Sequence, residues 1–223
     1  HRDFNEAGFY FKRAAELGDA EGMANLGYFI QRGFGGFQVD YEEASKWYKS
    51  SYERGNMEGC ARLGGLIAEK KIDQYDEEYG ANLIKLSCDN NDKVGLNSYG
   101  CLFVSGIAGH QKDYSKAFYY YKRAADLGFY IALTNVGNYY LKGLGVSKDI
   151  NKGIKYCQLA IEEGSPFAAK FLADFYNNPE SGIPIDKSKS LQYYKLANEM
   201  GIKDLEKNIN TLSNEQSKCC LLI

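Results

Sequence analysis

The sequence is poor in the residues that build most catalytic and metal sites. It has 2 histidines in 223 residues, His1 and His110, so we expect neither a histidine metal site nor a catalytic triad. Two glycine-containing segments, GFGG at 33–36 and GLGV at 143–146, are expected between helices rather than after a strand, which does not fit a phosphate-binding loop. We therefore predict a protein that is not an enzyme and needs no cofactor, metal ion or small-molecule substrate.

The chain also lacks charge of one sign, long apolar runs and proline. Its 27 basic and 29 acidic residues nearly cancel, which gives no electrostatic attraction for nucleic acid. No apolar run approaches the roughly 18 residues that a membrane-spanning helix needs. With only 3 prolines and 44% hydrophobic residues, the composition predicts a folded chain with a substantial core.

The cysteines do not form a recognisable framework. Their spacings are irregular and no C-x-x-C occurs among Cys60, Cys88, Cys101, Cys157, Cys219 and Cys220. A chain of this size does not need disulfides for stability, so free thiols and a cytoplasmic location are expected. The absence of any N-x-Ser/Thr sequon favours the same location. A secreted or lumenal repeat protein with disulfides is the alternative.

What the sequence does contain is an internal repeat. KRAAELG at 12–18 returns as KRAADLG at 122–128. Seven residues before the AA pair lies a small residue, here called the anchor, and the six anchors are Ala7, Ala44, Gly80, Ala117, Gly153 and Ser190. Successive anchors are 37, 36, 37, 36 and 37 residues apart. This period predicts stacked helical hairpins.

Other columns of the repeat have physical explanations. Four residues before each anchor is an Asp that can cap a helix, namely Asp3, Asp40, Asp76, Asp113, Asp149 and Asp186. Eleven after the anchor comes a helix-ending residue able to take the left-handed conformation: Gly18, Gly55, Asn91, Gly128, Gly164 and Gly201. Twenty after it come Gly27, Gly64, Gly100, Gly137 and Ala173, which predict close approach of a neighbouring helix. Each repeat is therefore helix A, a short turn, helix B and a loop.

These columns predict an all-α fold, a right-handed α/α superhelical solenoid of about six helix-turn-helix repeats. The solenoid is expected over residues 1–213, with repeats starting near 3, 40, 76, 113, 149 and 186. Residues 214–223 are expected to form a polar tether and a C-terminal tail, after a last helix at about 203–212.

The pattern resembles a known family. AGFYFKRAAELGDAEGMANLGYFIQRGFGG at 7–36 is similar to the Sel-1-like repeat, a relative of the tetratricopeptide repeat, and GLGVSKD at 143–149 matches its G-x-G-V-x-x-D loop. The resemblance covers residues 3 to 201, although repeats 2 and 3 drift, with AEKKID and SCDNND. It implies an adaptor or scaffold. A secreted branch of the family carries paired cysteines, and here Cys60 and Cys88 each lack their partner.

Two columns on helix A are candidate partner-binding residues. The first varies between repeats, two residues after the anchor, and includes Phe9, Lys46, Tyr119 and Lys155. We expect it to bind another protein on a concave helix-A face, and packing against a neighbouring repeat is the alternative.

The second column, five residues after the anchor, holds Lys12, Lys49, Lys85, Lys122 and Lys195. It could form a basic ribbon for an acidic ligand. Because an acid follows four residues later in every repeat, a solvent-facing row of ion pairs is the other interpretation.

The last four residues, Cys220-Leu221-Leu222-Ile223, fit the C-a-a-X prenylation signal, and Cys219 could take a second lipid. We expect a scaffold in the cytoplasm, with peripheral contact to the cytoplasmic face of a membrane. A short apolar tail packed on the last hairpin is the alternative. A further alternative is that the chain is a regulatory segment of a larger protein with a catalytic domain upstream of His1.

Overall fold

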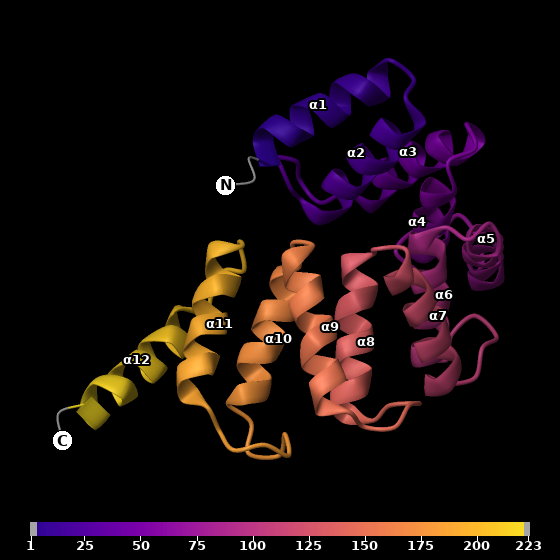
Figure 1. Cartoon of the computed structure of the whole chain (residues 1–223). Helices are drawn as coiled ribbons and strands as arrows, with labels where there is room; N and C mark the ends of the chain where they lie inside the picture. Colours follow the sequence, from indigo (N-terminus) through magenta and orange to yellow (C-terminus); the bar gives the residue numbers. More distant parts are fainter. Residues whose placement is uncertain (1–3, 221–223) are drawn as a thin grey trace. The chain divides into compact units, whose positions relative to one another are not determined.

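The computed structural model describes residues 4–220, with side chains as far as Glu215. Within these residues the chain forms twelve α-helices and no strand (Figure 1). The helices are α1 (Phe4–Glu16), α2 (Ala20–Arg32), α3 (Tyr41–Glu53), α4 (Met57–Ala68), α5 (Glu77–Asp89), α6 (Lys93–Ser105), α7 (Tyr114–Asp126), α8 (Tyr130–Lys142), α9 (Ile150–Glu162), α10 (Pro166–Tyr176), α11 (Lys187–Glu199) and α12 (Glu206–Cys220). The predicted all-α solenoid of helical hairpins is confirmed, with helix A of each repeat odd-numbered and helix B even-numbered.

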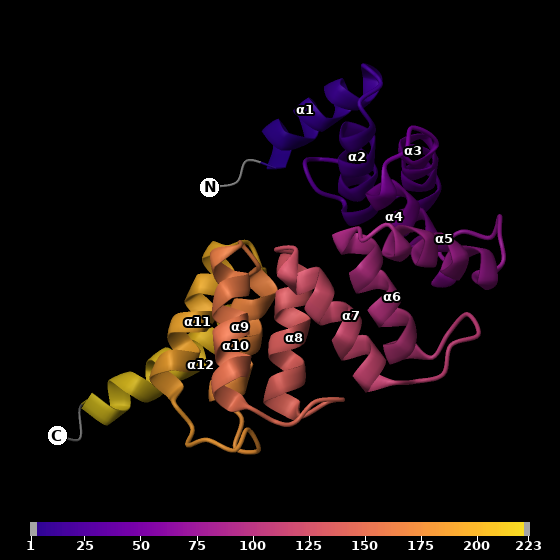
Figure 2. The same cartoon turned by 45° about the vertical axis from the view of Figure 1, so that its right-hand side comes forward.

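The chain divides into two compact units, which we describe separately. Unit 1 runs to Leu127 and holds α1 to α7, and unit 2 begins at Gly128 and holds α8 to α12. Inside each unit every helix packs on the helix before it and the helix after it, as Figures 1 and 2 show. In unit 1 two pairs of alternate helices also touch, α2 with α4 and α4 with α6.

The predicted aspartate caps begin the odd-numbered helices. Each described member of the column accepts a hydrogen bond from the backbone amide three residues later, at 2.7–2.9 Å: Asp40, Asp76, Asp113, Asp149 and Asp186. Asp3, the sixth member, lies outside the described residues. Four even-numbered helices, α2, α4, α6 and α10, are capped by the side chains of Asp19, Asn56, Asp92 and Ser165. The residue before α8, Phe129, forms no side-chain cap.

The predicted helix-ending column is also confirmed. All six of its residues have positive φ, from 56° at Asn91 to 106° at Gly201. Since this is the left-handed region, five of the six positions are occupied by glycine, and the sixth is an asparagine, the side chain that best tolerates it.

The glycines inside the even-numbered helices allow close helix packing, as predicted. A Cβ atom at Gly27 would lie 2.7 Å from the Tyr48 ring, and one at Gly64 would lie 2.6 Å from the Gly80 carbonyl oxygen. A second column of small residues, fifteen after the anchor, was not predicted and includes Gly22, Gly59 and Gly95. A Cβ at Gly59 would lie 2.6 Å from Ser51 Oγ on the preceding helix. Each of these even-numbered helices therefore presents small residues to both neighbours.

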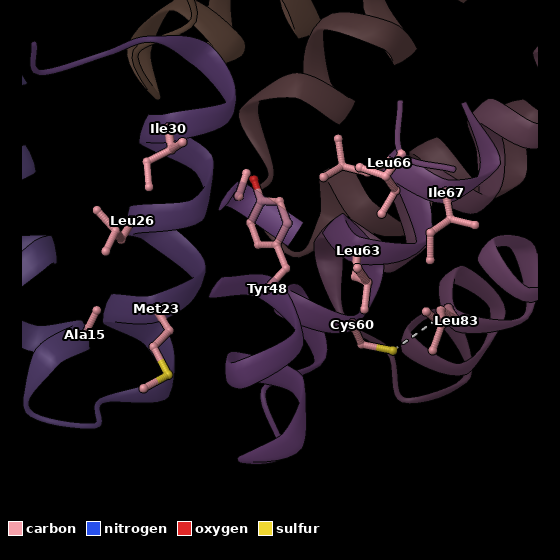
Figure 3. Close-up of a cluster of buried hydrophobic side chains, with 12 residues drawn as sticks. Ala15, Met23, Leu26, Ile30, Tyr48, Cys60, Leu63, Leu66, Ile67 and Leu83 are labelled. Atoms are coloured by element: carbon pink, nitrogen blue, oxygen red, sulfur yellow. Dashed lines mark hydrogen bonds between the residues drawn. The ribbon is translucent and has the colours of Figure 1, made fainter. Parts of the chain in front are cut away.

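The core of unit 1 lies between the helices of its first hairpins. Tyr48 is fully buried there, and Figure 3 shows it between Leu26 of α2 and Leu63 of α4. Its hydroxyl donates to Gln31 Oε1 at 2.6 Å, which satisfies the polar end of the ring. The Cys60 thiol donates to the Leu83 carbonyl oxygen at 3.3 Å. Unit 2 has its own core, in which Tyr194 and Leu212 are buried.

The four cysteines whose side chains the structure describes, Cys60, Cys88, Cys101 and Cys157, are free thiols. No helix in the described part of the chain is both long enough and apolar enough to cross a bilayer.

The last helix is longer than predicted. It was expected to end near residue 212, but α12 continues to Cys220, through much of the predicted tether. No glycine or proline interrupts NTLSNEQSKCC, so nothing in that stretch ends the helix. Lys187 Nζ lies 2.9 Å from Glu215 Oε2 and ties α12 to α11. The side chains of Cys219 and Cys220, and all of Leu221–Ile223, lie outside the description, so the predicted lipidation stays a prediction.

Candidate partner-binding surface

The named members of the predicted variable column are exposed. Phe9 on α1 is 66% exposed and Tyr119 on α7 is 56% exposed. Lys46 on α3 and Lys155 on α9 are also exposed. The contacts made by these side chains lie within single helices, such as Lys46 Nζ to Glu43 Oε2 at 3.7 Å. These residues stay candidates, without a common site that joins them.

Some lysines of the second column form ion pairs on their own helix, and others do not. Lys85 pairs with Asp89 at 2.6 Å, and Lys122 pairs with Asp126. Among the residues with described side chains, Lys12, Lys49 and Lys195 form no ion pair. The solvent-facing row of ion pairs is therefore present in repeats 3 and 4, and the remaining lysines stay available to an acidic ligand.

The even-numbered helices of unit 1 provide a surface that joins three repeats. Because α2 touches α4 and α4 touches α6, side chains on this row meet across repeat boundaries. Its centre is Arg62 of α4, whose guanidinium carbon lies 4.3 Å from the centroid of the Tyr28 ring on α2. Arg32 approaches the same ring at 6.0 Å. Tyr28 therefore contacts two cations from two helices.

Arg62 is held in place by more than this ring. Its Nη2 lies 2.6 Å from Glu58 Oε1 and its Nε donates to the same oxygen at 2.7 Å, and its side chain is 15% exposed. Burial by itself lowers the pKa of Arg62. The Glu58 carboxylate and the Tyr48 hydroxyl raise it, and the pKa lies above its ordinary value. The guanidinium is thus charged, paired and fixed in one geometry.

Two further features on these even-numbered helices are an uncovered stretch of backbone on α4 and a thiol on α6. Gly65 lies three residues further along α4, and a Cβ atom there would meet nothing within 4 Å, so bare helix backbone adjoins open space. On α6, which contacts α4, Cys101 is exposed and has its Sγ 3.3 Å from Tyr121 Oη. We call this strip the even-helix surface and define it as Tyr28, Arg32, Arg62, Gly65 and Cys101.

Sequence reasoning missed the even-helix surface, although a signal was present. Of its five residues, only Arg62 belongs to a column of helix B that varies, eighteen residues after each anchor: Asn25, Arg62, Ser98, Asn135 and Phe171. Variation beside constrained packing positions was the criterion applied to helix A, and it applies equally here.

The chain matches the family model of the Sel1 repeat over residues 2–19, 20–56, 94–129, 131–165 and 166–202. The full-length matches start at even-numbered helices, so the family's repeat begins one helix later than the predicted frame, with the period unchanged. The unmatched segment between 56 and 94 contains the AEKKID and SCDNND stretches, where the predicted repeats drift from the pattern.

Solved structures show the same fold. A Sel1 repeat protein from Oxalobacter formigenes is 27% identical, with a TM-score of 0.62 over 90% of this chain and 84% of that protein. Immunity protein Pa5087 from Pseudomonas aeruginosa is 20% identical, with a TM-score of 0.63 over 90% of this chain and 75% of that one.

A third structure is c5321, a protective antigen of uropathogenic Escherichia coli with an SLR fold. It is 23% identical, with a TM-score of 0.62 over 96% of this chain, which spans only 45% of that protein's length. Since the family model matches most of the sequence in successive segments at the observed period, the chain belongs to the Sel1 repeat family.

Proposed function

We propose that this chain is a non-enzymatic scaffold that binds a partner protein through the even-helix surface of unit 1. Sel1 repeat proteins are protein-interaction scaffolds, which supports the class of function. The observation that carries the choice of surface is the contact of the fixed Arg62 of α4 with Tyr28 of α2, which joins two successive repeats.

The chemistry of this surface favours protein binding. Tyrosine and arginine are the residues that most often contribute strongly to interface affinity. Arg62 is already ordered by Glu58 and Tyr28, so a partner would lose little side-chain entropy by using it. Gly65 leaves helix backbone uncovered, which allows a partner side chain or backbone to approach closely.

The face predicted from sequence is a second candidate surface on the same scaffold. It is favoured by the exposure of two large aromatic side chains, Phe9 and Tyr119. The basic ribbon belongs to this face, and charge reversal at Lys12, Lys49 and Lys122 together should weaken capture of an acidic partner if the ribbon binds it. Unchanged capture would support the alternative, a solvent-facing row of charges.

The scaffold proposal is tested by capture followed by titration. Tagged chain is used to isolate partners from cells of its own source, the bound protein is identified, and the purified pair is titrated by calorimetry. We expect saturable binding of a defined stoichiometry. The proposal fails if no purified candidate binds, or if the chain turns over a captured molecule.

We also propose a cytoplasmic scaffold tethered to a membrane through prenylated Cys220, with Cys219 available for a second lipid. The support is the C-a-a-X pattern, and two lipids would anchor the chain much more firmly than one. The intact mass of native protein from a eukaryotic source should exceed the sequence mass by that of a prenyl group, and Cys220→Ser should move the protein to the soluble fraction. An unmodified Cys220 in such a source would rule out this tether.

A further inference from the structure

A pocket of about 380 Å³ lies in unit 1, away from the residues of the even-helix surface. Its walls come from α5, from α6 and from the loop after α6. The residues that line it include Glu78, Asn82, Lys85, Tyr99, Gly109 and His110. This volume falls in the range of sites that enclose a small ligand or a single side chain. Asn82 and Lys85 belong to the two sequence columns of helix A, so this pocket is where those columns meet a loop of the next repeat.

One carboxylate next to the pocket is held by an ion pair. Glu77 Oε1 lies 2.5 Å from Lys70 Nζ. The hydrogen bond from Lys70 is the main reason that the pKa of Glu77 lies below its ordinary value. This ion pair connects the start of α5 with the residues that follow α4.

The aromatic wall is equally well held. His110 Nδ1 lies 2.9 Å from the Ala108 carbonyl oxygen, and because a carbonyl only accepts, Nδ1 carries the proton. The His110 ring meets Tyr99 edge-on at 5.5 Å, and Tyr99 in turn meets Tyr120 at 4.8 Å.

The charges around the pocket select the sign of a ligand. Lys85 is neutralised by Asp89 at 2.6 Å. Glu78 is exposed and has no ion pair or hydrogen bond to any other described side chain. The lining therefore combines the unpaired carboxylate of Glu78 with the aromatic ring of Tyr99, which together suit a cation.

We propose that this pocket receives a basic side chain, an Arg guanidinium or a Lys ammonium, presented by a protein partner. Glu78 pairs with the cation and Tyr99 forms the wall against which the aliphatic part of the side chain lies. The inference rests on the proposed scaffold function for its partner, but the pocket itself can be tested without one.

The probe is Nα-acetyl-arginine methylamide, titrated into the intact chain and followed by NMR. We expect millimolar binding with saturable shifts of the Tyr99 and His110 resonances. Glu78→Gln should weaken binding about fivefold, since a charge-assisted contact is lost. The matched control is Glu42→Gln, because Glu42 holds the same position two residues before the anchor in repeat 2 and should leave the affinity unchanged.

Three results would overturn the pocket proposal. These are no saturable shift at tens of millimolar probe, equal affinity for the Glu78→Gln variant, and tighter binding of Nα-acetyl-glutamate methylamide, which would assign the pocket to an anion through Lys85. None of them depends on partner capture by the even-helix surface, so failure of this pocket and failure of the scaffold function are distinguishable.

Discussion

Two adjacent glycines in α4 have opposite surroundings. A Cβ atom at Gly64 would lie 2.6 Å from the Gly80 carbonyl oxygen and 2.9 Å from Ile84 Cγ1, whereas one at Gly65 would meet nothing within 4 Å. Consecutive helical residues point about 100° apart, so one glycine faces the next helix while its neighbour faces open space.

This contrast predicts opposite effects of the same substitution. Gly64→Ala should lower the free energy of unfolding by about 1–3 kcal/mol, because backbone atoms of α5 must move. Gly65→Ala should raise it by up to about 1 kcal/mol, since alanine favours the helix and nothing obstructs its methyl group. Urea unfolding of the two variants measures both values, and similar effects would contradict the packing described for α4 and α5.

The buried thiols predict how stability depends on pH. Burial raises the pKa of the Cys157 thiol to about 12 and, with help from Asp92, that of Cys60 to about 11. Because the folded-state pKa values lie above the unfolded value of about 8.5, the folded chain holds these protons more tightly. The free energy of unfolding should be level below about pH 8 and fall by about 1 kcal/mol per such thiol by pH 9.5.

Urea titrations between pH 7 and pH 9.5 measure this slope. Cys157→Ala removes one of the titrating groups, so the variant should lose less stability over this interval than the original chain. A Cys157→Ala slope equal to that of the original chain would show that this thiol does not contribute.

At the scale of single elements, the start of α6 depends on one side chain. Asp92 Oδ1 accepts from the Gly95 amide at 2.7 Å and lies 3.0 Å from Ser87 Oγ of α5. Ser87 Oγ also lies 2.8 Å from the Met57 carbonyl oxygen at the start of α4. The cap thus belongs to a polar contact that links three successive helices.

We expect Asp92→Ala to lower the free energy of unfolding by about 1–2 kcal/mol, because the Gly95 amide loses its acceptor. Asp92→Asn keeps an oxygen in the same place and should cost less than half as much. Denaturant unfolding compares the two, and an equal loss in both variants would mean that charge, rather than the hydrogen bond, stabilises this end of α6.

Such local features are the ones that the sequence could predict. An Asp before an apolar stripe, or a glycine after it, acts through hydrogen bonds and φ angles within a few residues, so the caps and helix ends were found by position alone. The Asp column predicts no caps for the even-numbered helices, and Phe129 before α8 has no side-chain acceptor to supply one. The variable column of helix B indicates Arg62, but the contacts of α4 with α2 and α6 depend on how whole helices pack, so the other residues of the even-helix surface could not be read from the sequence.

At the scale of the molecule, each repeat contacts mainly its neighbours. A substitution on one exposed helix face therefore perturbs few contacts, and binding can be altered without unfolding the chain. Gly65 suits this approach especially well, because a Cβ atom added there meets no atom within 4 Å apart from the adjoining backbone of α4.

The most direct test of the account is the affinity of the purified partner for two variants, each checked for unchanged thermal stability. Gly65→Gln places a side chain in the middle of the even-helix surface, and Phe9→Ser removes an exposed aromatic ring from the opposing candidate face. We expect Gly65→Gln to weaken binding at least about tenfold, which corresponds to about 1.4 kcal/mol, and Phe9→Ser to leave it unchanged. Full affinity in Gly65→Gln together with loss in Phe9→Ser would contradict the account and assign the partner to the odd-numbered helices.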